Sequence, residues 1–337
     1  MKAMVLRRTA PIENEPLSYE DVPAPKPKAR EIIIEVSACG ICRTELDEIE
    51  GRLKPKIPVI PGHQVIGRVI ETGQAAERFR SGDRVGVAWI YSSCGKCRFC
   101  KRGLENLCEH FMGTGCDANG GYAEYMAVHE NYAYKIPEKF SDAEAAPLLC
   151  AGAIGYRALK LTRMEDGDVI GLYGFGSSSH ILFQVIRHLY PSSRIFVFTR
   201  RKGDAPSELA SKMGADWVGQ SGETPPSKMN CAIDTTPTGL PVREALRNLE
   251  KGGRLVMNLI RKEKPITDLD YTQHLWWEKE LKSVANITRR DVAEFLEIAA
   301  EVPLKPEVVE FKLEDANKAL LMLKNGEYRG SGVLTIR

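Results

Sequence analysis

Four cysteines lie within a fifteen-residue stretch, and this cluster constrains the fold more than any other feature of the sequence. They are Cys94, Cys97, Cys100 and Cys108, in the spacing C-x2-C-x2-C-x7-C. Four thiolates at this spacing can close a tetrahedron around Zn²⁺ and leave no open position, so such a site would be structural. The sequence therefore predicts a small zinc-binding lobe, with unrelated free cysteines or an iron–sulfur cluster as the alternatives.

The chain has 337 residues and nine cysteines, and its start does not resemble a secretion signal, so a disulfide framework is not expected. Its length suggests two domains of ordinary size. Hydrophobic residues make up 43% and charged residues 27%, which is typical of a globular protein. A formal net charge of +2 gives no indication of a nucleic-acid or membrane partner, and the apolar stretches are too short to span a membrane. We therefore expect a soluble cytoplasmic protein.

The first half of the chain has the pattern of a mainly β domain. Short strand-like runs alternate with turn signals at 31–36, 65–71, 83–87 and 120–128. This spacing favours a compact barrel or sandwich. We expect a partly open β-barrel that forms a catalytic domain in residues 1–150. A strand-like tail at 332–336 is expected to return to it, so that residues 289–337 complete the domain.

The pattern changes near residue 141, where Ser141 followed by Glu144 predicts a helix start. From Asp168 onward, short apolar strands alternate with helical segments, which predicts a parallel, doubly wound sheet. A second capping pattern at Thr288 predicts a further helix. We therefore expect the α/β fold class, with a dinucleotide-binding Rossmann domain in residues 151–288 beside the mainly β domain.

A glycine turn follows the first strand of this alternation and precedes a helix. It consists of Gly174, Phe175, Gly176, Ser177 and Ser178. The two glycines would permit a tight turn and a close approach of the backbone to a pyrophosphate, while the helix N-terminus supplies N–H donors. The sequence departs from G-x-G-x-x-G at its last position, and alone it also fits a plain turn. Its place between a strand and a helix favours dinucleotide binding.

The end of the next strand bears on which dinucleotide is bound. NAD-specific folds usually carry Asp or Glu there, whereas this strand ends in Thr199, Arg200 and Arg201. An arginine can pair with a 2′-phosphate, so NADP is favoured and NAD stays possible. The alternative is a solvated basic pair, with Asp204 reaching the ribose instead.

Three other segments carry Cys42, His63 and Cys150, which spacing alone would not join. Together with the cysteine cluster and the glycine turn, they resemble the zinc-containing medium-chain alcohol dehydrogenases, in the right order and over essentially the whole chain. The resemblance implies that these three residues bind a catalytic zinc and leave a fourth position for water or substrate. Zinc there would polarise an alcohol oxygen, and hydride would pass to the nicotinamide.

The resemblance also implies roles for neighbouring residues. Thr44 would hydrogen-bond the reacting oxygen and take its proton, and Arg43 would contact the pyrophosphate. Glu45 would orient the imidazole of His63. Trp89 would line the substrate pocket.

Two positions depart from the family pattern. Gln64 stands where many relatives have Glu after the ligand His, which would leave the metal more electrophilic. Asp47 stands where a proton-relay His is frequent. A carboxylate with an ordinary pKa of about 3.9 is a poor base at neutral pH, so the proton could instead leave through the ribose hydroxyl. Both changes could also be harmless.

We therefore predict a zinc-dependent, NAD(P)-dependent alcohol dehydrogenase with two zinc ions per chain and a small alcohol or aldehyde as substrate. A homodimer or homotetramer is expected, with edge strands for an intersubunit sheet from 254–258 through 283–287. No nucleic-acid or membrane partner is expected. The alternatives are a polyol dehydrogenase, a zinc-free quinone or enone reductase of the same fold, a zinc-ribbon binding module, or a coenzyme-binding homologue without turnover.

Overall fold

The computed structural model describes residues 1–336 and divides into two compact units. The first unit contains residues 1–153, residues 286–300 and the segment from Lys305 onward. The second unit contains residues 154–285 and the short stretch 301–304. The chain therefore leaves the first unit after residue 153, returns at residue 286, and leaves it again only for the short stretch 301–304. The assignment of a catalytic role to one unit and of dinucleotide binding to the other stays a prediction.

The first unit is mainly β. Its strands are β1 (Lys2–Leu6), β2 (Leu17–Asp21), β3 (Glu31–Gly40), β4 (Val65–Thr72), β5 (Arg84–Val87), β6 (Ile90–Ser92), β7 (Met112–Gly113), β8 (Tyr125–His129), β9 (Ala133–Lys135), β16 (Val308–Lys312) and β17 (Ser331–Thr335). Its α-helices are α1 (Arg43–Ile49), α2 (Asp142–Ala145), α7 (Arg289–Glu301) and α8 (Ala316–Asn325). Single 3₁₀ turns are η1 (Ile12–Asn14), η2 (Cys100–Arg102), η3 (Glu105–Leu107), η4 (Glu130–Tyr132), η5 (Ala146–Leu149) and η7 (Leu313–Asp315).

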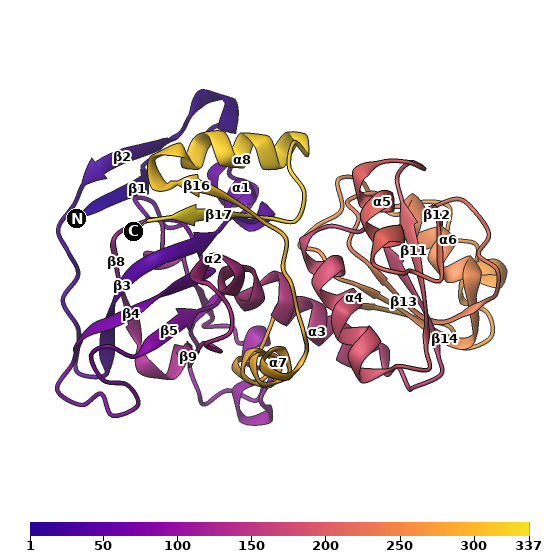
Figure 1. The fold of residues 1–337 in the computed structure, drawn as a ribbon, viewed down its shortest axis with the longest axis horizontal. Helices are drawn as coiled ribbons and strands as arrows, with labels where there is room; N and C mark the ends of the chain where they lie inside the picture. The colour runs from indigo at the N-terminus through magenta and orange to yellow at the C-terminus, as the bar shows by residue number, and fades with distance from the viewer. Residues whose placement is uncertain (337) are drawn as a thin grey trace. The chain divides into compact units, whose positions relative to one another are not determined.

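β3 is the centre of the main sheet, whose strands run in the order β16-β17-β3-β4-β5-β9. β4 pairs along one edge of β3, while β8 pairs with residues 31–35 and β17 with residues 38–40. Figure 1 shows the yellow strands β16 and β17 beside the indigo β3, so the C-terminal segment returns to this unit as expected. The described strands do not close into a barrel. The unit is thus mainly β and open, which confirms this part of the predicted fold class.

The length and central place of β3 follow from its side chains. Ile32, Ile33, Ile34 and Val36 are all buried, so apolar residues occupy both faces of the strand. β-branched side chains suit a pleated backbone, and a strand that is covered on both faces carries a nearly continuous apolar run. β3 therefore forms the core against which the other strands of this sheet assemble.

The second unit alternates strands with helices. Its strands are β10 (Val169–Tyr173), β11 (Arg194–Thr199), β12 (Trp217–Gln220), β13 (Met229–Asp234), β14 (Leu249–Met257) and β15 (Glu280–Ser283). Its helices are α4 (Ser177–Leu189), α5 (Ala205–Lys212) and α6 (Leu240–Asn248), with a π-helical turn η6 (Tyr271–Leu275); α3 (Ala151–Thr162) leads into the unit. All neighbouring strands are parallel, in the order β12-β11-β10-β13-β14-β15.

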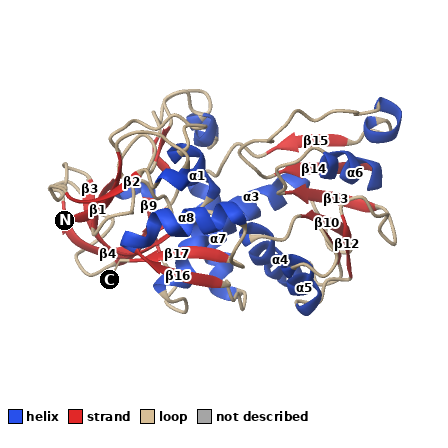
Figure 2. Cartoon of the chain, turned by 90° about the horizontal axis from the view of Figure 1, so that it is seen from above, coloured by secondary structure: helices blue, strands red, loops and turns tan. Residues whose placement is uncertain are grey.

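The strand order of this sheet reverses between β10 and β13, as it does in a doubly wound fold. In both Figure 1 and Figure 2, α4 and α5 lie on one face of the sheet and α6 lies on the other. Helices on both faces bury the strands, and β10 is buried along its whole length. The predicted parallel Rossmann-like sheet is confirmed.

Some local structure differs from the sequence-based expectation. The strand expected at 120–128 begins only at Tyr125, and β12 was not expected. The helix whose start the Ser141 cap predicts is divided at Cys150, because Pro147 lies in the 3₁₀ turn η5 and Cys150 has non-helical dihedral angles. This division matters because it places Cys150 at a bend instead of on a continuous helix. In the described chain, no helix is long and apolar enough to cross a membrane.

Candidate zinc and coenzyme sites

The first unit brings together Cys42, His63 and Cys150, which are far apart in the sequence. Their ligand atoms all lie within 4.8 Å of one another. Cys42 stands between β3 and α1, His63 precedes β4, and Cys150 stands between η5 and α3. Two thiols and one imidazole are the donor set of a catalytic zinc site that keeps an open position. The expected juxtaposition is present, and the role of these residues as zinc ligands remains a proposal.

Glu45 contacts two of these three residues. One of its carboxylate oxygens accepts the backbone N–H of Cys42 at 2.9 Å. The other lies 2.5 Å from Nδ1 of His63 and accepts the backbone N–H of the same residue at 3.2 Å. The carboxylate is fully buried, so these contacts are shielded from water. Glu45 therefore fixes the imidazole with Nδ1 turned toward the carboxylate, as a metal-binding histidine requires.

The electrostatics of the cluster suit a bound cation. Nε2 of His63 is buried and has no hydrogen-bond partner among the described residues, which leaves it available as a ligand. The pKa of Cys42 is lowered, chiefly by its hydrogen bond with Cys150 and also by His63, although burial opposes this shift. Negative charge is thus favoured on a ligand sulfur. An orphaned imidazole nitrogen beside a thiolate is a good fit for Zn²⁺.

Two other residues of the predicted active site adjoin the cluster. Thr44 is buried at the start of α1, and its hydroxyl oxygen lies 3.5 Å from Sγ of Cys42. The ring of Trp89 meets the imidazole of His63 edge to face, with 5.0 Å between centroids. Arg43 lies between Cys42 and Thr44 on an exposed position of α1. The threonine and the tryptophan therefore border the candidate metal position.

The two departures from the family pattern have separate structural settings. Asp47 forms an ion pair with Arg52, and its backbone carbonyl accepts the N–H of the same arginine at 2.8 Å. Gln64 is buried against Gly40, where any side chain would come within 2.8 Å of the glutamine. The Asp47 carboxylate thus binds the arginine that follows the C-terminus of α1. The Gln64 side chain fills space beside β3.

Glu48 is a buried residue of this region that the sequence analysis did not single out. It lies one turn after Glu45 on α1, and neither of its carboxylate oxygens has a hydrogen-bond partner among the described residues. Burial raises its pKa well above the ordinary value, and the neighbouring Glu45 adds to the shift. The short helix α1 is buried on nearly all sides and has no amphipathic pattern. The sequence therefore does not show that Glu48 is buried instead of exposed to solvent.

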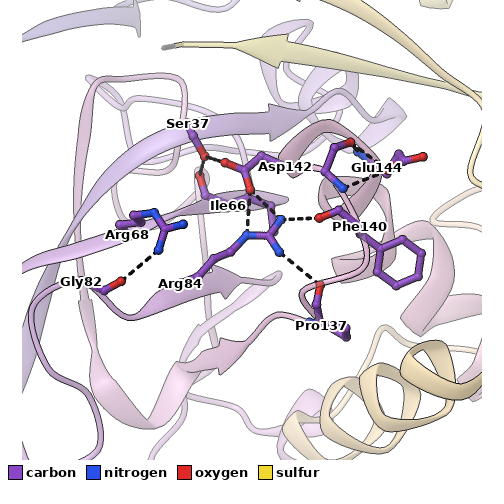
Figure 3. Close-up of polar contacts among 10 residues, drawn as sticks. Ser37, Ile66, Arg68, Gly82, Arg84, Pro137, Phe140, Asp142 and Glu144 are labelled. Carbon is purple, nitrogen blue, oxygen red and sulfur yellow. Dashed lines mark hydrogen bonds and ion pairs between the residues drawn. The ribbon is translucent and has the colours of Figure 1, made fainter.

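The segment that carries Cys150 is anchored by a polar network (Figure 3). Arg84 of β5 donates two hydrogen bonds to Oδ1 of Asp142, at 2.8 and 2.6 Å, and others to the carbonyls of Pro137 and Phe140. Ser37 of β3 donates to the other oxygen of Asp142 at 2.5 Å. Asp142 begins α2, which continues through η5 to Cys150. Two strands thereby hold the start of the segment that places the third candidate ligand.

On the other side of Cys150, packing leaves no room for a side chain. A Cβ atom on Gly152 would lie 2.4 Å from the ring of Phe295, which is fully buried on α7. Such a distance is far shorter than van der Waals contact, so only glycine fits here. The helix α7 and the first turn of α3 therefore fix the backbone that follows the candidate ligand.

The four clustered cysteines form a second candidate metal site, also in the first unit. Their sulfur atoms all lie within 4.8 Å of one another. Backbone N–H groups donate to three of the sulfurs, at 3.4 Å for Cys94, 3.5 Å for Cys97 and 3.3 Å for Cys108. The backbone N–H groups of Lys96 and Cys97 lower the pKa of Cys94 to about 6. Burial raises the pKa of Cys100 to about 11, so the lobe favours a thiolate at Cys94 and disfavours one at Cys100. The four sulfurs together form the donor set of a closed Zn(Cys)₄ centre.

An ion pair connects the cysteine lobe to the start of α7. Glu105, which lies between the last two cysteines, accepts the backbone N–H and the Nε–H of Arg289 at 3.1 and 3.0 Å. The guanidinium of Arg289 also stacks on Tyr132, 5.0 Å from the ring centroid. Glu105 is buried, so this ion pair is part of the packed structure of the unit.

The glycine turn of the second unit has the geometry expected of a nucleotide loop. Gly174 has a φ of +88°, and a Cβ there would lie 2.5 Å from Oγ1 of Thr235. A Cβ on Gly176 would meet no atom within 4 Å, so open space adjoins the backbone just before α4. Phe175 is buried and Ser178 accepts a hydrogen bond from Asn258 at 3.3 Å. The backbone of Gly176, at the N-terminus of α4, therefore adjoins open space, as a phosphate-binding turn requires.

The end of β11 distinguishes the two alternatives for the adenosine ribose. Both oxygens of Asp204 are engaged, because they accept the N–H groups of Arg201 at 3.2 Å and of Ser207 at 2.9 Å. Asp204 thereby caps the N-terminus of α5. Arg200 and Arg201 are exposed, and Oγ1 of Thr199 donates to the carbonyl of Arg201. The arrangement favours an arginine over Asp204 as the group that meets the ribose.

A mainly β unit with two sulfur-rich candidate metal sites, followed in the sequence by a doubly wound sheet with a glycine turn, is the arrangement of a nucleotide-dependent class of oxidoreductase. Residues 28–138 match the model of the alcohol dehydrogenase GroES-like domain. The chain is 42% identical to a probable alcohol dehydrogenase, AdhA, of Mycobacterium tuberculosis, over 100% of this chain and 97% of the relative. It is 33% identical to an alcohol dehydrogenase of Geobacillus stearothermophilus over the full length of both.

A solved structure gives the same result. The alcohol dehydrogenase of the hyperthermophilic archaeon Aeropyrum pernix superposes with a TM-score of 0.87, at 25% identity and over 100% of both chains. The chain therefore belongs to the zinc-type medium-chain alcohol dehydrogenase family. This confirms the family that the sequence motifs resemble.

Proposed function

We propose that this chain is a zinc-dependent dehydrogenase that transfers hydride between NADP and a small primary or secondary alcohol, or the corresponding aldehyde or ketone. Family membership makes it an oxidoreductase of alcohols and aldehydes with NAD or NADP as coenzyme. The cluster of Cys42, His63 and Cys150 carries the finer proposal, because its donor set and its orphaned imidazole nitrogen fit zinc. When bound there, zinc would supply a Lewis acid for the substrate oxygen.

The chain's own residues would supply orientation and proton transfer. The hydroxyl of Thr44 lies beside the cluster and can accept a proton from a substrate hydroxyl while it donates its own onward. Glu45 keeps the His63 ring in position. Asp47 is paired with Arg52, so we assign it no part in proton transfer. Trp89 provides an apolar wall next to the imidazole, which suits the carbon skeleton of an alcohol.

The preference for NADP rests on the end of β11. Its arginines are exposed, and the two carboxylates near them are engaged, because Asp204 caps α5 and Glu223 pairs with Lys202. Replacement of Arg200 by Gln should lower kcat/KM for NADP about tenfold while kcat/KM for NAD changes little, because only NADP carries the 2′-phosphate. A wild-type enzyme that clearly prefers NAD would refute this part of the proposal.

Metal analysis and turnover together test the zinc proposal. We expect about two zinc ions per chain, one at the Cys42 cluster and one in the Cys94–Cys108 lobe. Replacement of Cys150 by Ser should remove about one zinc and abolish alcohol-dependent NAD(P)H formation, with the lobe zinc retained. A protein that keeps its activity after this metal has been lost would contradict the mechanism. A protein that never contains zinc would instead favour a zinc-free reductase of the same fold.

We also propose a homodimer formed through β15. This strand pairs with β14 on one side only, and its free edge could continue the sheet into a second copy. A two-fold axis through Leu281 would place Glu280 of one copy opposite Lys282 of the other. The preceding segment exposes a cluster of aromatic rings, Tyr271, Trp276 and Trp277, that a second copy would cover.

A further inference from the structure

A buried ion pair joins two loops of the second unit, at the carboxyl ends of β13 and β14. Asp234 is the last residue of β13 and is fully buried. Its carboxylate contacts Nζ of Lys262, which belongs to the loop after β14. Burial raises the pKa of Asp234, although the ammonium group opposes this shift. A charge in such a place is costly unless it is paired, so each member of the pair depends on the other.

The same ammonium group also holds the backbone of the first loop. Nζ of Lys262 donates to the carbonyl of Thr236 at 2.7 Å and to that of Thr238 at 2.9 Å. Asp234 in turn accepts the N–H of Thr236 at 2.9 Å and its hydroxyl at 2.6 Å. One lysine and one carboxylate thus fix the conformation of the loop at 235–238.

This loop lies against the glycine turn. Thr235 donates its backbone N–H and its hydroxyl to the carbonyl of Tyr173, at 2.9 and 3.0 Å, and its Oγ1 fills the space next to Gly174. β10 and β13 are the two strands at which the strand order reverses. Open α/β sheets bind their ligands at the carboxyl ends of the strands at this point. The loop that Lys262 holds is therefore one wall of the candidate dinucleotide site.

The position of this wall indicates which half of the dinucleotide it meets. A doubly wound sheet consists of two mononucleotide-binding halves. The half formed by β10, β11 and β12 carries the glycine turn and the arginines for the adenosine ribose. The half formed by β13, β14 and β15 is then left for the nicotinamide mononucleotide.

We propose that Lys262 is a positioning residue for the nicotinamide half of the coenzyme, acting through Asp234 on the loop at 235–238. The inference rests on the proposed coenzyme binding and names a residue for it. Lys262 does not touch the reacting atoms in this scheme. It keeps the loop after β13 against the glycine turn, so that the wall is formed before the coenzyme arrives.

The sequence of the second unit offers a matched control. Arg187 on α4 also donates to one carboxylate, Asp216, at 2.6 Å, and to two carbonyls, those of Ser193 and Gly214, at 3.0 and 2.7 Å. These partners precede β11 and β12, at the amino ends of the strands. Loss of Arg187 therefore removes the same set of interactions from the edge of the sheet that holds no candidate ligand.

Binding of NADPH and of 2′-phospho-ADP-ribose to the metal-loaded protein tests the proposal, because the second ligand lacks the nicotinamide. Lys262→Met should weaken NADPH binding at least about tenfold and change binding of the fragment less than about twofold. Arg187→Met should change neither. The double variant Asp234→Asn/Lys262→Met leaves no unpaired buried charge, and it should show the same selective loss of NADPH binding in a folded protein.

The outcomes separate the inference from the function on which it rests. If the two Lys262 variants bind both ligands equally more weakly, or bind NADPH as the wild type does, the proposed role of Lys262 is wrong while the coenzyme proposal stands. Failure of the wild-type protein to bind either ligand would remove the coenzyme proposal itself. Thermal unfolding of each variant, measured in parallel, identifies the samples that are folded.

Discussion

Glu45 connects the backbone of one candidate zinc ligand to the side chain of another. Its two oxygens meet the N–H of Cys42 and Nδ1 of His63, and these residues come from different elements. A carboxylate behind a metal-binding imidazole selects its tautomer and increases its basicity. The residue therefore influences the metal although it is not one of the proposed ligands.

Replacement of Glu45 by Gln should lower the affinity of the Cys42 site for zinc by about 10–100-fold, because the amide still meets the N–H of Cys42 but removes the negative charge from His63. Competition with a chromophoric chelator measures this affinity. Asp47→Asn is the matched control, since it removes a carboxylate from the same helix that pairs with Arg52 instead of His63. Equal effects of the two substitutions would show that helix stability, and not the histidine contact, is responsible.

Glu130 provides a prediction for the dependence of stability on pH. Burial opposes its ionisation, but the N–H groups of Arg78 and Glu77 each donate to it at 2.7 Å, and the net result is a lowered pKa. Its contribution is therefore present above the unfolded pKa, about 4.3, and is lost as the pH falls through the lower folded value. The melting temperature of Glu130→Gln should lie below that of the wild type at pH 7, and the gap should narrow on acidification. A gap that is constant with pH would contradict this assignment.

At the scale of residues, the sequence was most informative where the motif is local. The cysteine lobe could be predicted from spacing alone, and the glycine turn from its place between a strand and a helix. The Cys42, His63 and Cys150 cluster required the family resemblance, because its members are joined only by the folded sheet. Glu48 and Lys262 could not have been found, since their environment depends on which distant loops pack around them. The engagement of Asp204 as a helix cap likewise became visible only in the structure.

At the scale of elements, capping residues predict where helices begin, whereas composition does not predict the short strands. Thr288 and Asp291 form the expected reciprocal cap at the start of α7. β12 has only four residues, includes a glycine and is half exposed, so neither alternation nor an apolar run marks it. The bend at Cys150 is set by Pro147 together with tertiary packing on both sides, which local propensity does not capture.

The segment that carries Cys150 depends on Arg84 for its anchorage. Arg84→Met should lower the free energy of unfolding by about 1–3 kcal/mol, because partly buried acceptors at Pro137, Phe140 and Asp142 lose their donor. Urea denaturation measures the change. Arg68→Met is the control within the same region (Figure 3), since Arg68 makes one exposed hydrogen bond to the carbonyl of Gly82. A similar loss in both variants would argue against a special role for the Asp142 network.

At the scale of the whole molecule, the open edge of β15 and the exposed rings before it predict association. Replacement of both Trp276 and Trp277 by Ser should convert the proposed dimer into a monomer, because the covered apolar area is lost. Light scattering after size-exclusion chromatography gives the mass directly. Tyr19→Ser removes an aromatic ring of similar exposure from β2 in the first unit and should leave the mass unchanged. A double variant that stays dimeric would place the interface elsewhere.

The pairing of β17 with β3 has a consequence for synthesis of the protein. Residues 38–40 pair with residues 333–335, so this part of β3 stays unpaired until a strand nearly 300 positions later has been translated. At about 5–20 residues per second, that delay is roughly 15–60 s. The second unit is almost contiguous and can fold during this interval. A nascent chain stalled before residue 331 would therefore leave the edge of β3 at residues 38–40 without its partner strand, and an unpaired strand edge is the kind of surface that chaperones bind and from which aggregates form.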